Sequence, residues 1–216
     1  MKAYIDVPDS LSDIKLRQYQ KFVKETKDNE DTDFIQNKII EIFCNVRASD
    51  VNKIKYTDIK KISNRVNKLF EEKPALVRNF NLYGVNYYFI PNLDEISLGE
   101  YIDIDTYISD WDNIHIAMNV LYRPLKQKLK EKYLIEDYNE KNNTVLQDMP
   151  LDAVMSSIFF FYHLGNDLLK VIVNYLQNNQ EIQQALDQTS VKSGDGITVS
   201  MLSLKETLRN LKKLLD

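Results

Sequence analysis

Apolar residues recur with a helical period along most of the chain. Between residues 10 and 25 they fall on one face, which predicts an amphipathic helix. Similar stripes predict a second helix capped by Asp33 and a third capped by Thr57, since both residue types accept hydrogen bonds from helix N–H groups. Pro74 ends the third helix. A short connector is expected at 47–55.

The period changes near residue 79. Residues 79–82 and 85–90 have the polar and apolar alternation of strands, and Tyr83-Gly84 supplies a two-residue turn between them. This pattern predicts a β-hairpin. Residues 96–104 are expected to form a third extended segment or a loop.

Helical spacing returns at about residue 105 and continues to 121. Pro124 breaks or kinks this helix, and a helical continuation over 125–132 stays open. The longest predicted helix runs from Pro150 to about Asn178. Its first half is apolar on nearly every face, so we expect it to be buried at the centre of the fold.

These elements predict a mostly α (α+β) fold with a small antiparallel β-hairpin or three-stranded sheet near 79–104. We expect one compact domain over 1–189, a Ser/Gly linker over 190–196 and an amphipathic C-terminal helix over 197–216. That helix has an apolar seam spaced 3, 4, 3 and 4: Met201, Leu204, Leu208, Leu211 and Leu215. A helix of two heptads is too short to be stable alone, so it must pack on its own domain or on a partner.

Composition and charge exclude several classes. The 216 residues include 28 Lys and Arg against 32 Asp and Glu, so the basic excess of a dedicated nucleic-acid binder is missing. The one cysteine, Cys44, excludes an intramolecular disulfide and is expected to be a buried thiol. The two histidines, His115 and His163, stand apart and are expected to be structural. The most apolar run, 153–164, is shorter than the roughly 20 residues of a membrane span, so we expect a soluble protein.

An acidic segment is the strongest candidate for chemistry. Residues 94–112 carry seven acids and no Lys or Arg. In an extended segment Asp103 and Asp105 would share a face, and with Asp94 they could hold a divalent metal for phosphoryl-transfer or nuclease chemistry. The alternative is a solvated acidic loop that caps helices. We expect no metal, no cofactor and no catalytic residue.

Two basic stretches, 53–73 and 123–132, leave a nucleic-acid-binding accessory role as a second alternative. A solvated surface is the favoured explanation of both stretches, and they could instead pair with the acidic segment 94–112, within the chain or across an interface. We do not expect nucleic acid to be the main partner.

Aromatic residues give the candidate protein interface, because Tyr and Trp are enriched at interfaces, although they are also ordinary strand residues. The candidates are Tyr83, Tyr87, Tyr88, Trp111, Tyr122 and Arg123, together with the C-terminal seam Met201, Leu204, Leu208, Leu211 and Leu215.

Three stretches, Phe80–Asp103, Trp111–Pro124 and Met149–Phe161, carry a resemblance. They resemble a family of small proteins encoded near the structural genes of tailed bacteriophages, including crAss-like phages. The resemblance implies a virion-associated or assembly role and supplies no enzyme residues. We therefore expect a non-enzymatic phage protein that binds other structural or assembly proteins, and self-association through its C-terminal helix stays open. It would act in the host bacterial cytoplasm during assembly or in the virion.

Overall fold

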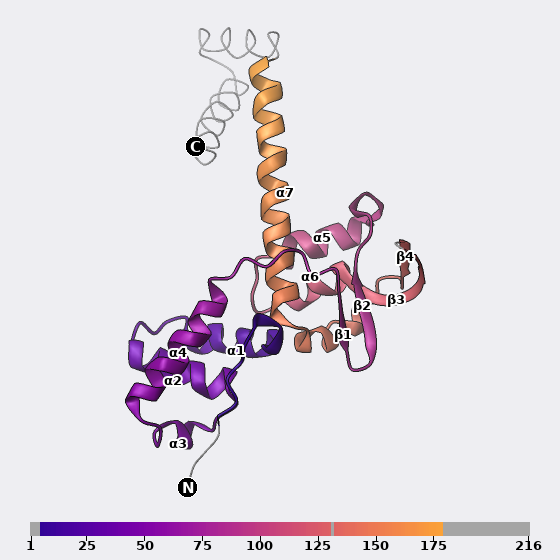
Figure 1. The fold of residues 1–216 in the computed structure, drawn as a ribbon. Helices are drawn as coiled ribbons and strands as arrows, with labels where there is room; N and C mark the ends of the chain where they lie inside the picture. Colours follow the sequence, from indigo (N-terminus) through magenta and orange to yellow (C-terminus); the bar gives the residue numbers. More distant parts are fainter. Residues whose placement is uncertain (1–4, 131, 179–216) are drawn as a thin grey trace, which may run out of the picture. The chain divides into compact units, whose positions relative to one another are not determined.

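The computed structural model describes residues 5–130 and 132–178 (Figure 1). The chain divides into two compact units, residues 1–159 and 160–216. The predicted linker 190–196 and the helix 197–216, with its seam Met201, Leu204, Leu208, Leu211 and Leu215, lie outside the described residues. The domain boundary predicted at 189 falls there too and stays a prediction.

The first unit begins with a group of helices: α1 (Leu16–Thr26), α2 (Thr32–Phe43), α3 (Ala48–Val51) and α4 (Tyr56–Phe70). Their apolar faces enclose a core that includes Ile40, Cys44, Val51 and Ile59. The predicted stripes are confirmed, since each of the longer helices buries one face.

Two predicted caps are wrong by two residues. Asp31, not Asp33, caps α2, and its carboxylate accepts a hydrogen bond from the Asp33 N–H at 2.9 Å. Helix α4 starts at Tyr56 after Lys55, which places Thr57 inside the first turn. The expected connector at 47–55 contains the short helix α3.

The predicted hairpin is confirmed. Strands β1 (Asn79–Leu82) and β2 (Val85–Phe89) pair antiparallel through a two-residue turn. Tyr83 and Gly84 at that turn have φ values of 53° and 83°. Two successive positive φ values are typical of a type I′ turn, whose twist matches that of the flanking strands.

The expectation of a third extended segment or loop over 96–104 is wrong, because α5 (Leu98–Tyr107) occupies it. A capping box starts the helix. The Ser97 hydroxyl accepts from the Glu100 N–H at 3.3 Å, and the Glu100 carboxylate accepts from the Ser97 N–H at 2.6 Å. Both N–H groups would otherwise lack partners at a helix start.

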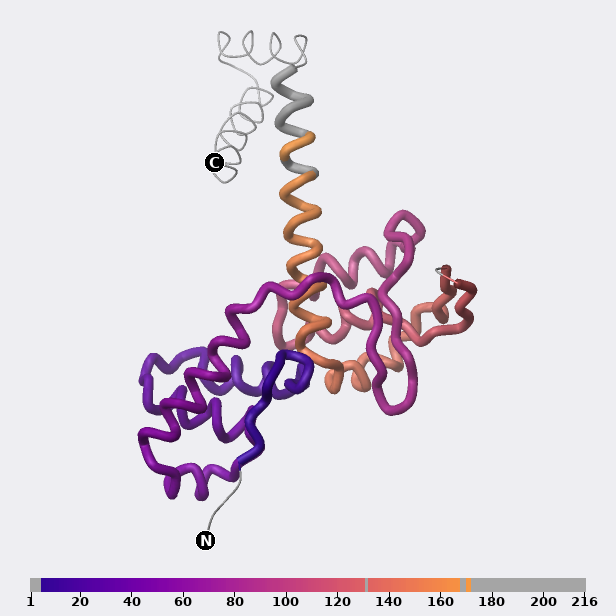
Figure 2. Tube along the Cα trace, viewed as in Figure 1, coloured from indigo at the N-terminus to yellow at the C-terminus, as the bar shows by residue number. Residues whose placement is uncertain are grey.

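The remaining strands follow α6 (Ile114–Leu121), which continues directly into β3 (Tyr122–Leu129) (Figure 2). Strand β4 (Lys132–Ile135) completes an antiparallel sheet with the order β1-β2-β3-β4. A helical continuation over 125–132 is therefore wrong. Pro124 lies in β3 opposite Tyr87. A proline disfavours helical backbone at the residue before it, so the chain leaves α6 and continues as a strand.

The last described helix, α7 (Leu151–Asn178), confirms the longest predicted helix. Its beginning is buried in the first unit, where Leu151, Ala153 and Val154 are inaccessible to solvent. A bridge between Lys15 and Pro150 precedes it: the Leu16 N–H donates to the Met149 carbonyl at 2.9 Å, and the Leu151 N–H donates to the Ile14 carbonyl at 2.8 Å. The fold is thus mainly helical with one small sheet, as expected. None of the described helices has the length and apolar character that crossing a bilayer requires.

Candidate protein interface

Two of the predicted interface residues belong to the core. Tyr87 and Tyr122 are 5% and 0% exposed, so the prediction that they offer surface to a partner is wrong. The Tyr122 hydroxyl donates to the Val77 carbonyl at 2.7 Å and lies 3.0 Å from the Ser157 hydroxyl. Burial raises the pKa of Tyr122 to about 12. Apolar packing on the inner face of the sheet accounts for both rings.

Arg123 is also occupied within the chain. Its guanidinium pairs with the Glu100 carboxylate, and its Nε donates to the Val120 carbonyl at 3.0 Å. Burial alone would raise the pKa of Glu100, but hydrogen bonds from Ser97 and the Arg123 charge lower it. One residue of the basic stretch 123–132 thus pairs with the acidic segment 94–112 within the chain. The prediction that Arg123 is an exposed interface residue is wrong.

Trp111 is partly buried against α1. Its ring packs on Tyr19 with centroids 4.6 Å apart, and its carbonyl accepts from the Gln20 side chain at 2.9 Å. These contacts fix the turn that precedes α6. Trp111 therefore joins α1 to the turn before α6 within the first unit.

Tyr83 is exposed and Tyr88, like Trp111, is partly exposed. Tyr83 is 68% exposed at the hairpin turn, while its hydroxyl donates to Asp148. Asp148 is buried and also pairs with Arg17 at 2.6 Å and Lys15 at 3.3 Å. Although burial opposes it, these hydrogen bonds and charges lower the pKa of Asp148.

The acidic segment does not assemble a metal site. Among residues 5–130 and 132–178, no three His, Cys, Asp or Glu side chains are grouped to hold an ion. Because α5 is helical, Asp103 and Asp105 point to different sides. Asp103 accepts from the Tyr138 hydroxyl at 2.7 Å, while Asp94 and Asp105 are exposed. The carboxylates of this segment therefore cap a helix (Glu100), accept a hydrogen bond (Asp103) or face solvent (Asp94 and Asp105).

Two other candidate reactive groups, His115 and Cys44, are buried, whereas His163 is exposed on α7. His115 is 8% exposed, and burial lowers the pKa of its imidazole. Its Nδ1 lies 3.4 Å from the Gln20 amide nitrogen. Burial, with a smaller contribution from the charge of Asp6, raises the pKa of the Cys44 thiol to about 11. Both groups occupy core positions, as the sequence predicts.

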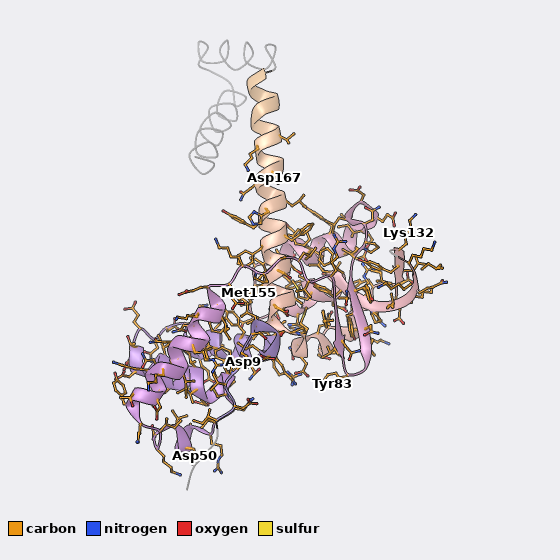
Figure 3. The ribbon with its side chains drawn as sticks, viewed as in Figure 1. Asp9, Asp50, Tyr83, Lys132, Met155 and Asp167 are labelled. Carbon is orange, nitrogen blue, oxygen red and sulfur yellow. The ribbon has the colours of Figure 1, made fainter. Side chains whose placement is uncertain are left out.

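A groove of about 780 Å³ lies along the hairpin formed by β3 and β4. The hairpin contributes Gln127, Leu129, Lys132, Tyr133 and Leu134, and the segments around β1 and β2 contribute Arg78, Pro91, Asn92 and Glu95. Figure 3 shows Lys132 on this hairpin and Tyr83 at the separate β1–β2 turn. The groove and the turn are therefore different surfaces of the first unit.

Two leucines are the most accessible apolar part of the groove. Leu129 and Leu134 are 65% and 59% exposed. Leu129 lies opposite Lys132, and Leu134 lies opposite Gln127. Side chains alternate between the faces of a strand, so these four residues share one face of the hairpin.

The charge around the groove is predominantly positive. Arg78 and Lys132 line it, whereas Lys128 alternates with Gln127 and Leu129 along β3 and therefore lies on the other face of the hairpin. The acid in the lining, Glu95, accepts a hydrogen bond from the Asn92 amide at 3.0 Å. Cations beside exposed leucines favour a partner that carries both carboxylates and apolar side chains.

Sequence reasoning missed Leu129 and Leu134. The available signal was the period-two alternation of Lys126, Lys128 and Lys130, which is typical of a strand rather than a helix. No family model, no curated protein and no solved structure matches this chain.

Proposed function

We propose that this chain is a non-enzymatic bacteriophage structural or assembly protein that acts by binding other phage proteins. The observation that carries the proposal is the pair of exposed leucines, Leu129 and Leu134, in a positively charged groove. Large apolar side chains gathered in a concave surface are typical of interfaces. The phage setting comes from the sequence resemblance.

The groove suits an extended acidic segment of a partner. Strand β4 is at the edge of the sheet, and an edge strand can accept another strand through backbone hydrogen bonds. Leu129 and Leu134 would receive apolar side chains of that segment. Arg78 and Lys132 would attract its carboxylates. Binding of this kind requires surface complementarity and no reactive centre.

An array of short overlapping peptides from the virion proteins of tailed bacteriophages tests the proposal. We expect the labelled full-length protein to bind peptides rich in both acidic and apolar residues. The double variant Leu129→Gln/Leu134→Gln should weaken that binding by about tenfold or more, the usual effect of losing central apolar anchors. The matched control is Leu98→Gln, which alters a 75% exposed leucine outside the groove. Equal binding by the double variant and the wild type would contradict the proposal.

Nucleic acid is the competing ligand, because Lys126, Lys128 and Lys130 lie on one hairpin. Titration of a single-stranded oligonucleotide at several salt concentrations separates the two. A phosphate-binding surface loses affinity steeply with salt and with Lys→Gln changes, but it tolerates the leucine changes. That result would replace protein binding with the nucleic-acid alternative.

A further inference from the structure

Helix α5 carries exposed apolar side chains on one face. Leu98, Tyr101 and Ile102 are 75%, 54% and 51% exposed. Residues three and four apart lie on the same side of a helix, so these three side chains form one stripe. Asp105, which is also exposed, lies seven residues after Leu98 and continues the stripe by two turns. The α5 stripe, residues 98, 101, 102 and 105, therefore combines apolar side chains with an acid.

The opposite face of α5 holds the helix on its own unit. Ile104 is buried there, and the Glu100 carboxylate pairs with the Arg123 guanidinium. Asp103 accepts a hydrogen bond from the Tyr138 hydroxyl at 2.7 Å. These contacts fix the orientation of α5, so its stripe cannot turn to cover the groove of the same copy. An exposed apolar stripe on a fixed helix is typical of an interaction surface.

The groove beside β3 and β4 has the complementary chemistry. Leu129 and Leu134 offer exposed apolar surface, and Arg78 and Lys132 supply positive charge. The α5 stripe offers apolar side chains and a carboxylate, and residues 94–112 contain no Lys or Arg that would oppose the match. Opposite charges on two surfaces favour their contact and fix its register. Each copy of the chain thus carries two surfaces that fit one another.

We propose that the α5 stripe of one copy binds the groove of a second copy. The apolar side chains of the stripe would lie against Leu129 and Leu134, and Asp105 would face the cations of the groove. Because the two surfaces differ, each copy can donate its stripe to one neighbour and accept the stripe of another. The inference rests on the proposed function, since it uses the same groove, and it names a second copy of this chain as one partner.

Pairwise binding between two variants of the full-length protein tests this contact. Tyr101→Gln/Ile102→Gln alters the stripe, and Leu129→Gln/Leu134→Gln alters the groove. All four side chains are more than half exposed, so these changes leave the core intact. A mixed pair keeps one intact groove and one intact stripe, whereas each variant paired with itself lacks one of the two surfaces. We expect the mixed pair to bind at least about tenfold more tightly than either self pair, measured with one copy immobilised.

The three pairings also exclude other arrangements. Equal affinity in all of them, or no binding in the mixed pair, would overturn the inference. Strong self-binding by the groove variant would place stripe against stripe, and strong self-binding by the stripe variant would place groove against groove; either result overturns it. The matched control is Val85→Gln, which alters an exposed residue of β2 outside both surfaces and should bind itself as the wild type does.

The peptide array separates this inference from the proposed function. The stripe variant and Leu98→Gln both keep the groove, so in dilute solution they should bind acidic, apolar peptides as the wild type does. Such a peptide in excess should displace the second copy from the mixed pair. Peptide binding without mixed-pair binding would overturn only the contact between copies. Mixed-pair binding without capture of any peptide in the array would contradict only the proposed function.

Discussion

Glu100 on α5 and Arg123 on β3 form an ion pair whose side chains are only 10% and 11% exposed. The pair extends into a network, because the Arg123 guanidinium also lies over the Tyr138 ring, 5.9 Å from its centroid. The Tyr138 hydroxyl in turn donates to Asp103. The acidic segment and the sheet are thus joined by charge as well as by packing.

Removing one partner of this pair should destabilise the protein strongly. Arg123→Met leaves the Glu100 carboxylate buried without its cation, which typically costs about 3–5 kcal/mol. Urea unfolding monitored by circular dichroism measures the loss. The double variant Glu100→Gln/Arg123→Met should be more stable than Arg123→Met alone, since no unpaired charge remains. Arg47→Met is the control: Arg47 pairs with Asp50 at the surface, and its removal should not change stability measurably. A small effect of Arg123→Met would show that the pair is not structural.

Two Gly→Ala substitutions should have opposite signs. Gly84 has a φ of 83° at the hairpin turn, so Ala there should cost about 1–2 kcal/mol. Gly99 lies in the first turn of α5, and an added Cβ would meet nothing within 4 Å. Ala at Gly99 should stabilise the protein by about 0.5 kcal/mol through helix propensity. Thermal unfolding of the two variants compares them directly, and a shift in the same direction would contradict the backbone assignment.

Cys44 should react slowly with thiol reagents in the folded protein. The thiol is buried and its pKa is about 11, so little thiolate is present at neutral pH. We expect almost no labelling by iodoacetamide under native conditions and complete labelling in denaturant, read by mass spectrometry. Fast native labelling would mean that the core around Ile40 and Val51 opens readily.

Stability should fall as the pH drops below 6.5, because of His115. Burial lowers the pKa of this imidazole below its ordinary value of 6.5, and the charge of Asp110 only partly offsets that effect. The unfolded chain therefore takes up a proton first, so the contribution of His115 to stability is constant at higher pH and declines as the pH falls through 6.5. The decline continues until the pH passes the folded pKa.

The substitution His115→Gln should abolish this decline. Urea unfolding on either side of pH 6.5 compares the variant with the wild type. Asp148 and Glu100 add a separate loss at lower pH, since their lowered pKa values stabilise the fold only while they are ionised. An unchanged pH profile in the variant would exclude His115 as its source.

Local patterns predicted the parts of the fold that depend on a single apolar face. Helices α1, α2, α4 and α7 each follow a helical period. Helix α5 was missed, although the capping box of Ser97 and Glu100 is visible in the sequence. Strand β3 was missed because its pairing is non-local: Arg123 lies opposite Tyr88, far away in the sequence.

The candidate site was harder to predict than the helices. The groove combines Arg78 with Gln127 and Leu134, and no local pattern joins these segments. Aromatic content pointed to Tyr87 and Tyr122, whose rings fill the core instead. Residue type alone does not distinguish an aromatic side chain that packs inward from one that meets a partner, because both uses favour large rings.

The bridge between Lys15 and Pro150 has a consequence for synthesis on the ribosome. Residues 14–16 emerge early, but their backbone partners at 149–151 are among the last of the first unit to be translated. Until then the Leu16 N–H and the Ile14 carbonyl lack the backbone partners that they have in the finished fold. A nascent chain stalled before residue 149 should consequently be sensitive to proteases and should recruit chaperones. A chain in which residues 149–151 have left the ribosome can form the bridge to residues 14–16.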